Sequence, residues 1–212
     1  MSGTAGERMT GSVTAGPAAA GVARVWAGSL AAVLLRRRPA TGPRHSAETR
    51  QLVLVLVVSE AVAAFPLSSM LPPGIRPAHA ALEVLVVLAG LGLVAALVRH
   101  PHEVGGERVV LRTGFRGELA LPRAAVRCAA PVVRTVPGRG PRPVPDEPEA
   151  VACSVGESLN VALRLDPPVR FDLGPAGVVD ARTVYASADS PAALAAALHA
   201  APPRSQDSPK TF

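Results

Sequence analysis

The chain has 212 residues, of which 49% are hydrophobic but only 3% are aromatic, and its formal net charge is +6. A soluble domain of this length needs more Phe, Tyr and Trp to fill its core, so the composition argues against one large soluble core. The hydrophobic residues are mostly Ala, Val and Leu in two runs. This distribution is typical of a membrane protein with room for one small domain of about 100 residues.

Basic residues flank the two apolar runs. Seven arginines lie in residues 1–50 and nine in residues 99–142, whereas residues 143–201 are acidic. Basic flanks attract anionic lipid headgroups by about 1 kcal/mol per residue. No aromatic side chains interleave with these arginines, so we expect lipid and not nucleic acid as the partner. Lys210 is the only lysine, and this bias, with abundant Ala, Pro and Gly, is typical of a GC-rich genome of the actinobacterial kind.

Three segments precede the first apolar run. Residues 1–21 are predicted to be disordered, and they lack the early basic and apolar regions of a secretory signal. Residues 22–38 carry apolar side chains at helical spacing around Trp26 and end in Arg36, Arg37 and Arg38. We expect an amphipathic helix in the membrane interface, with these arginines against anionic lipid. A third membrane span is the alternative interpretation. Residues 39–50 form a basic linker.

Residues 51–98 are predicted to form a two-helix transmembrane hairpin. Residues 51–71 and 79–98 are each long enough to cross a hydrocarbon core of ~30 Å, and residues 72–78 have the composition of a turn. Arginines lie before the first helix and after the second, whereas the loop holds only Arg76. The positive-inside rule therefore places both termini in the cytoplasm of a multi-pass plasma-membrane protein. A buried helical hairpin in a soluble protein is the alternative.

Two carboxylates interrupt the apolar runs. An ionisable residue inside a span costs roughly 2.5–3.5 kcal/mol on insertion scales. Glu60 lies about 13 Å from the cytoplasmic end and Glu83 lies near the opposite end, so we do not expect them to share a proton. We expect both to bond across a helix interface or between protomers of a homo-oligomer, which Gly92 and Ala96 favour as small residues. The alternative is ion handling by Glu60 within a larger assembly.

Residues 105–200 are predicted to form a small cytoplasmic β domain, because the pattern changes to short strands separated by turns. A turn or helical step is expected at 122–128, and five prolines predict an exposed loop at 137–148. Ser190 and Pro191 predict the start of a helix over 192–200, and residues 201–212 are predicted to be a disordered tail. The expected strands are 108–113, 115–121, 131–136, 150–155, 159–165, 169–173 and 182–188.

The order of short strands followed by one helix resembles the bacterial pleckstrin-homology-like (PH-like) domain, a bent β-sheet or half-barrel closed by a helix. The residues that carry this resemblance are 109–114 with the Pro122 step and Val126, 160–165 with 167–169, and 184–191. Two helices followed by such a domain are similar to the arrangement in small actinobacterial membrane proteins. The resemblance implies binding or assembly and supplies no catalytic residues. The Pro-rich stretch departs from the compact pattern of that family.

The sequence predicts no catalytic residues, no metal site and no cofactor. His100 and His102 have the spacing of two metal ligands, but they lack an acidic or Cys partner nearby in the sequence and are expected to be solvated. Cys128 and Cys153 are expected to be small buried hydrophobic residues. The candidate binding residues after the hairpin are Arg112, Arg116, Arg123 and Arg127. They are expected to face lipid headgroups or an acidic partner, or alternatively to form a solvated or ion-paired basic face.

These features predict a membrane α-helical hairpin followed by a small α+β domain. We expect a non-enzymatic, membrane-tethered interaction module that docks lipid or an unknown protein partner. The alternative is a subunit of a transport or ion-handling membrane assembly that uses the intramembrane Glu60.

Overall fold

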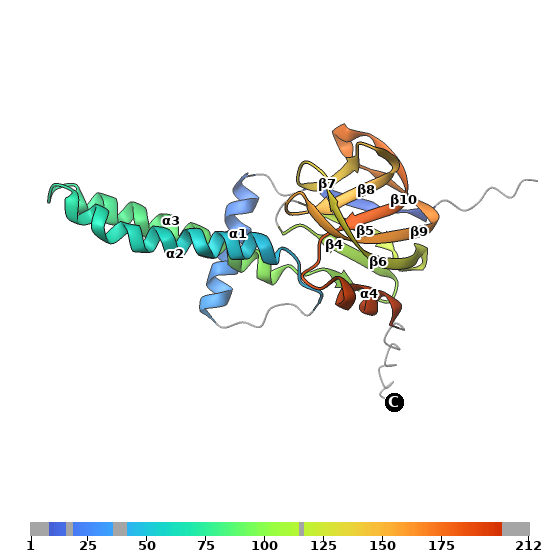
Figure 1. The fold of residues 1–212 in the computed structure, drawn as a ribbon, viewed down its shortest axis with the longest axis horizontal. Coiled ribbons are helices and arrows are strands. Elements are labelled where there is room, and N and C mark those ends of the chain that lie inside the picture. The colour runs from blue at the N-terminus through green and yellow to red at the C-terminus, as the bar shows by residue number, and fades with distance from the viewer. Residues whose placement is uncertain (1–8, 16–18, 36–41, 115–116, 201–212) are drawn as a thin grey trace, which may run out of the picture.

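The computed structural model describes residues 9–15, 19–35, 42–114 and 117–200. A long helical hairpin projects from a domain of two β-sheets, and a shorter helix crosses the hairpin close to that domain (Figure 1). The prediction of two long apolar helices with a small α+β domain is confirmed. Arg36, Arg37, Arg38, Arg116 and the predicted tail 201–212 lie outside the described residues.

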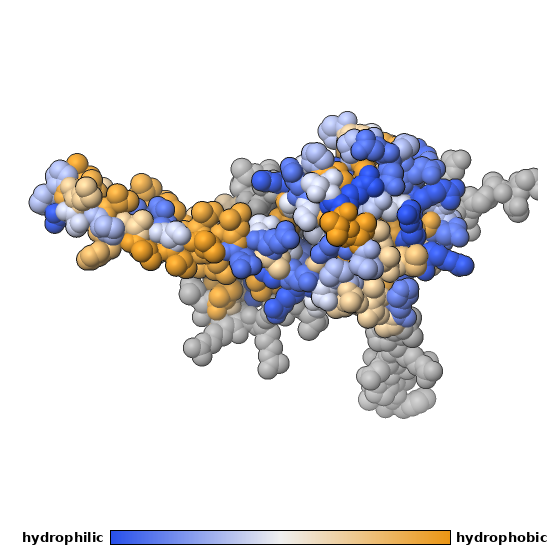
Figure 2. Space-filling model, in the orientation of Figure 1, coloured by the Kyte–Doolittle hydropathy of each residue, from blue (hydrophilic) through white to orange (hydrophobic). Residues whose placement is uncertain are grey.

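The hairpin consists of α2 (Ala47–Met70) and α3 (Arg76–Arg99). Both helices are long and apolar enough to cross a membrane. Each is longer than predicted, because Ala47 and Glu48 extend the first helix and Arg76 and Pro77 begin the second. Large apolar side chains cover the outer surface of the hairpin, which is mostly orange in Figure 2. This surface would be costly to expose to water.

The two helices meet along a line of half-buried side chains, which we call the seam. On α2 the seam contains Val53, Val57, Glu60, Ala64 and Ser68, and on α3 it contains His79, Glu83, Val87 and Gly90. The members recur every three or four residues, which places them on one helix face. A side chain at position 90 would overlap Val57, so glycine is needed there for the close approach of the helices.

The third helix, α1 (Ala19–Leu34), crosses α3 near the domain (Figure 1). The indole Nε1 of Trp26 donates a hydrogen bond of 2.9 Å to the carbonyl oxygen of Ala89. A Cβ at Gly92 would overlap the same indole ring. Ser29 and Ala32 of α1 are also buried. The small residue at position 92 therefore lies under Trp26 within the chain.

The larger sheet has six strands, β1 (Met9–Thr10), β6 (Val126–Thr135), β7 (Gly140–Val144), β8 (Glu147–Ser154), β9 (Ser158–Asp172) and β10 (Val178–Ala186). Their order is β1-β9-β10-β8-β7, and β6 pairs with β9 on the same side as β1. β10 runs antiparallel to β9 but parallel to β8. The sheet is therefore mixed.

The smaller sheet has four antiparallel strands in the order β2-β5-β4-β3: β2 (Ser12–Ala15), β3 (Glu103–Val104), β4 (Arg108–Arg112) and β5 (Gly117–Pro122). Phe171 of β9 is the largest fully buried side chain, and it belongs to a core shared with Leu111 and Leu119 of this sheet. The helix α4 (Pro191–His199) contributes Leu194 and Leu198 to the same core. Ser190 caps α4 as predicted, because its side chain accepts a hydrogen bond from the Ala193 amide.

The prediction of a disordered N-terminus is wrong for residues 9–15. Met9 pairs with Val169 of β9, and residues 12–15 pair with residues 117–120 of β5. Two short strands carry too little periodicity to be detected in a sequence, and they form because strands of both sheets are available at their sides. The domain is therefore built from both sides of the hairpin.

The predicted Pro-rich loop 137–148 is also wrong, because residues 140–144 form β7 and β8 begins at Glu147. β7 lies at the edge of its sheet, where Pro141 and Pro143 are tolerated despite lacking an amide hydrogen. The buried Arg142 holds this hairpin through bonds of 2.8–3.1 Å to the carbonyl oxygens of Val136, Pro137 and Gly140 and to Oγ of Ser154. Likewise, the two strands expected at 159–165 and 169–173 form one strand, β9.

Candidate functional site

Three segments meet where the hairpin joins the domain: residues 42–50, 99–102 and 187–189, which we call the junction. The amide of Asp189 donates to the Arg44 carbonyl oxygen at 2.8 Å, and the amide of His102 donates to the Pro43 carbonyl oxygen at 2.9 Å. The chain before α2 is thus bonded both to the segment after α3 and to the segment after β10. These bonds fix the orientation of the hairpin relative to the domain.

The carboxylate of Asp189 joins the domain to the first turn of α2. Its Oδ1 accepts a hydrogen bond of 2.8 Å from the Ala47 amide, and its Oδ2 accepts one of 2.6 Å from Nη2 of Arg50. The first amides of a helix lack partners within the helix and favour a negative charge. Arg50 also donates to the His45 carbonyl oxygen at 2.6 Å through Nη1. Asp189 therefore acts as an N-terminal cap supplied from a distant part of the chain.

Two histidines stack in the interior of the junction, where each is 1% exposed. The rings of His45 and His102 lie 4.8 Å apart between centroids, at 29°. Nδ1 of His102 accepts a hydrogen bond of 3.0 Å from the Arg112 amide, so it carries no proton. Nε2 of His102 then donates to the Ser187 carbonyl oxygen at 2.9 Å. These partners specify the neutral Nε2–H form of His102.

Burial is the main reason that these histidines are neutral. It lowers the pKa of His102 to about 4, and the neighbouring His45 lowers it further. Burial also lowers the pKa of His45, although its bond to the His100 carbonyl oxygen, 2.8 Å from Nε2, opposes the shift. A charged imidazole without a counterion is unfavourable in such an interior. The junction is therefore built for two uncharged rings.

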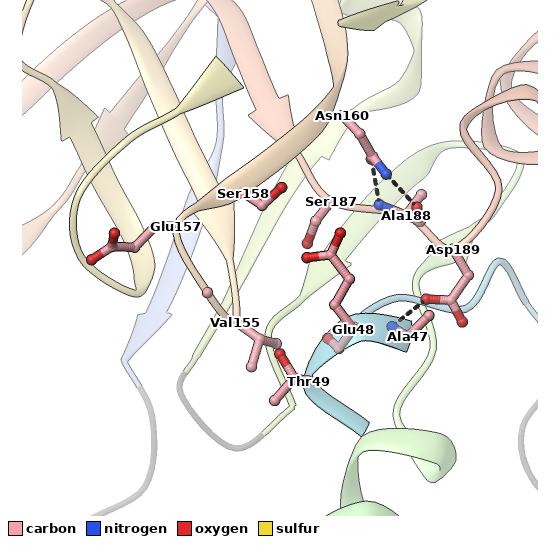
Figure 3. A pocket seen from close by; sticks show the side chains of 12 residues that line it. Ala47, Glu48, Thr49, Val155, Glu157, Ser158, Asn160, Ser187, Ala188 and Asp189 are labelled. Atoms are coloured by element: carbon pink, nitrogen blue, oxygen red, sulfur yellow. Dashed lines mark hydrogen bonds between the residues drawn. The ribbon is translucent and has the colours of Figure 1, made fainter. Parts of the chain in front are cut away.

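A pocket of about 300 Å³ lies beside the junction, between the first turn of α2 and the domain. Glu48 extends from α2 toward Ser187, whereas Glu157 on the opposite wall points away from it (Figure 3). The amide of Asn160 pairs with the backbone of Ala188 through bonds of 2.7 and 2.8 Å and holds one wall in place. The pocket is polar and open, and its shape depends on the position of α2.

The junction contains a serine beside a histidine, since Ser46 Oγ bonds to Nδ1 of His45. Ser46 has a left-handed φ of 69°, which is uncommon for serine. A serine nucleophile also requires donors for an oxyanion, but the nearest amide, that of Ala47, is already bonded to Asp189. We therefore assign the Ser46–His45 bond a structural role at the start of α2.

The structure places the predicted intramembrane carboxylates on the same seam. Glu83 lies 3.3 Å from Nε2 of His79, one turn away on α3. Moving from the Val57–Gly90 contact toward the loop, Glu60 is reached after three residues and Glu83 after seven. At 1.5 Å per residue the two are offset by about 6 Å along the hairpin. Oε2 of Glu83 and Nδ1 of His79 are buried without hydrogen-bond partners among the described residues.

The predicted basic site does not assemble from the arginines that the structure describes. Arg112 pairs with Glu103 at 2.9 Å and with Glu118 at 3.2 Å. Arg123 instead donates to carbonyl oxygens at the end of α4, those of Ala197 at 3.2 Å, Leu198 at 3.0 Å and Ala200. Arg127 is exposed on β6. Two of the three arginines are thus committed to contacts within the domain.

The junction residues were missed at the sequence level. His102 was expected to be solvated but is buried, and His45, Arg50 and Asp189 drew no attention because they are far apart in the chain. Cys153 is buried as expected, but Cys128 is exposed, contrary to expectation. Among the described residues, no group of three His, Cys, Asp or Glu side chains could hold a metal ion.

No family model, no curated protein and no solved structure matches this chain.

Proposed function

We propose that this chain is a multi-pass plasma-membrane protein that holds a non-enzymatic interaction domain against the cytoplasmic membrane surface. The observation that carries the proposal is the junction, in which Asp189 of the domain is bonded to Ala47 and Arg50 of an apolar helix. A flexible linker would suffice for a simple anchor. A bonded junction instead sets which faces of the domain meet the lipid and which face the cytoplasm.

The position of α1 supports an interfacial helix rather than a third span. α1 crosses α3 at Gly92, and the 16 residues from there back to Arg76 rise about 24 Å. This length is close to the ~30 Å hydrocarbon core. α1 would then lie in the plane of the cytoplasmic interface, with Trp26 near headgroup depth.

Anionic headgroups and an unknown protein are the partners that this arrangement would serve. Arg24 on α1 and Arg44 beside α2 are exposed at the base of the hairpin, where each would gain about 1 kcal/mol from an anionic surface. The PH-like character of the domain remains part of this proposal. It rests on the order of strands followed by a helix that packs on the core through Leu194 and Leu198.

Hydrogen exchange of the full chain in nanodiscs tests the lipid contact. The full chain is needed because β1 and β2 come from residues 9–15, which a fragment starting at residue 105 would lack. We expect slower exchange in α1 and residues 42–49 when phosphatidylglycerol is added to phosphatidylcholine, and reversal by high salt. Equal exchange in both lipids would refute docking on anionic headgroups.

Labelling with a membrane-impermeant maleimide tests the topology. Ile75, in the hairpin loop, is 53% exposed, and Cys128 is an exposed thiol on the domain. In intact cells, Ile75→Cys combined with Cys128→Ser should be labelled, whereas the native Cys128 should react only after permeabilisation. Labelling of Cys128 in intact cells would overturn the cytoplasmic assignment.

A second candidate is proton or ion handling within a membrane assembly. The observation that favours it is the shared seam of Glu60, Glu83 and His79. Toward the domain, however, Val53 and Val57 pack on Gly90 and leave no polar continuation. In proteoliposomes, Glu60→Gln should abolish ion or proton flux and leave assembly intact. Absence of flux through the native protein would remove this candidate.

A further inference from the structure

We propose that the stacked pair His45 and His102 is a proton-operated latch: protonation of the pair releases the domain from the base of the hairpin. The pair has the right location, because its partners lie on every segment of the junction. His45 is bonded to the His100 carbonyl oxygen after α3, and His102 is bonded to the Ser187 carbonyl oxygen after β10. Breaking these bonds would separate the hairpin from the domain.

The hydrogen bonds of His102 are satisfied only in the neutral ring. A proton on Nδ1 would face the Arg112 amide hydrogen at the 3.0 Å position where that nitrogen now accepts. Two donors cannot share this contact. The bond to β4 would therefore be replaced by repulsion, and the amide of Arg112 would be left buried without a partner. The geometry alone makes protonation and closure of the latch incompatible.

The charges around the pair do not compensate for a proton. Arg50 on α2 and Arg112 on β4 disfavour it, and His100 after α3 adds to this. Asp189 after β10 is the carboxylate that favours protonation, but it is already bonded to Arg50 and the Ala47 amide. Around His100, Arg99 and Glu118 act in opposite directions. If one ring were charged, its stacked neighbour 4.8 Å away could not also become charged without repulsion.

The expected response lies in the mildly acidic range. The pKa of His102 is about 4 in the closed junction and 6.5 for a solvated histidine. The closed state is fully stable above pH 6.5 and loses stability as the pH falls toward 4, because the released state binds the proton more tightly. His102 alone then shifts the equilibrium toward release by about 30-fold between pH 7.5 and pH 5. His45 acts in the same direction.

Release would also change the pocket beside the junction. Ser46 and Ala47 form one wall of the pocket, and Ser187 and Asp189 form another. These walls belong to segments that the latch holds together. The pocket would therefore open or disperse when the hairpin and the domain part, so that acidification acts on it without any ligand.

Electron–electron double resonance on the full chain in phosphatidylcholine nanodiscs tests the latch. One spin label is placed at Val58→Cys, which is 60% exposed on the outer side of α2, and the other at the native exposed Cys128. Cys153 is fully buried, and burial raises its pKa to about 12, so it stays unlabelled. We expect one narrow distance distribution at pH 7.5 and a broad one at pH 5, with recovery on return to pH 7.5. A narrow distribution at both pH values would overturn the proposal.

The double variant His45→Asn, His102→Asn should keep the distribution narrow at pH 5, since an Asn oxygen can accept from the Arg112 amide without titrating. Broadening at pH 5 in a double variant that is narrow at pH 7.5 would refute the latch. Should this variant fail to fold, nitrogen NMR of the native histidine rings decides the matter. The His102 ring should become protonated at the pH where the distances broaden, and broadening with neutral rings would overturn the proposal.

His79→Asn and His199→Asn are the matched controls. His79 lies on the hairpin seam and His199 is exposed at the end of α4, so neither contacts the junction. Both variants should broaden at pH 5 as the native chain does. Loss of the response in His79→Asn would place the sensor in the hairpin and refute the latch.

Discussion

Asp189 and Arg50 form an ion pair of 2.6 Å across 139 positions of the sequence, and it connects the end of the β domain to the first turns of the hairpin. Both side chains are largely shielded, at 20% and 16% exposure. A shielded, charge-assisted pair of this kind is stronger than a surface pair. The relation between hairpin and domain therefore depends on a few identifiable atoms.

Asp189→Asn should destabilise the protein by about 1–3 kcal/mol, because it removes a charge from the Arg50 guanidinium and weakens the cap on α2. Thermal unfolding of the full chain in detergent micelles measures the change. Asp180→Asn is the matched control, since its pair with Arg170 is 4.0 Å long and both side chains are about half exposed. Its effect should stay within about 0.5 kcal/mol. Equal effects of the two variants would contradict the assignment.

Gly92→Val should displace α1 from the hairpin, because a side chain at position 92 would overlap the Trp26 indole. Trp26 is the single tryptophan, so its emission reports on this contact directly. We expect altered emission and a changed pattern of quenching by lipids brominated at different depths. Gly28→Ala on α1, where an added Cβ meets nothing within 4 Å, should leave both unchanged. An unaltered spectrum in Gly92→Val would show that the two helices do not pack as described.

Arg123→Gln should loosen the end of α4. Arg123 bonds to the carbonyl oxygens of Ala197 and Leu198, which lack partners within the helix. We expect a loss of about 1–2 kcal/mol and faster hydrogen exchange across residues 194–199. Arg127→Gln, at an exposed position only four residues away, is the control and should change neither quantity. A lipid-binding role for Arg123 would instead predict reduced lipid contact with α4 intact.

The two cysteines should differ strongly in reactivity. Cys128 is exposed, whereas Cys153 is fully buried and has a pKa raised to about 12, so almost no thiolate forms at neutral pH. A thiol assay at pH 7.5 should detect one fast-reacting thiol per native chain and two after denaturation. Cys128→Ser should abolish the fast reaction. A fast reaction that survives this substitution would show that Cys153 is accessible.

The sequence predicted the parts of the fold that depend on local patterns. The two apolar helices are visible as long hydrophobic runs, and Ser190 with Pro191 marks the start of α4. The β4–β5 hairpin was found because its strands are neighbours in the chain. Each of these features depends on residues within about 25 positions of one another, which is the range over which periodicity and capping are informative.

The parts that were missed depend on contacts between distant segments. Met9 finds its partner at Val169, and a two-residue strand has no pattern of its own. His102 follows a span and precedes a charged residue, which locally predicts solvation, yet residues near 43 and 187 enclose it. Arg123 has the local setting of a lipid-facing arginine, but the end of α4 comes to lie beside it. No local rule gives the position of these partners.

Prolines at the sheet edges have a consequence for crowding on the membrane. Copies of a tethered domain move in two dimensions with their edges at the same height, so collisions between edge strands are far more frequent than in free solution. β6 and β7 are edge strands of the larger sheet, and they carry Pro131, Pro141 and Pro143. Each proline removes a backbone donor that a neighbouring strand would need for pairing. The domain can therefore reach a high density on the membrane surface without its sheets joining edge to edge.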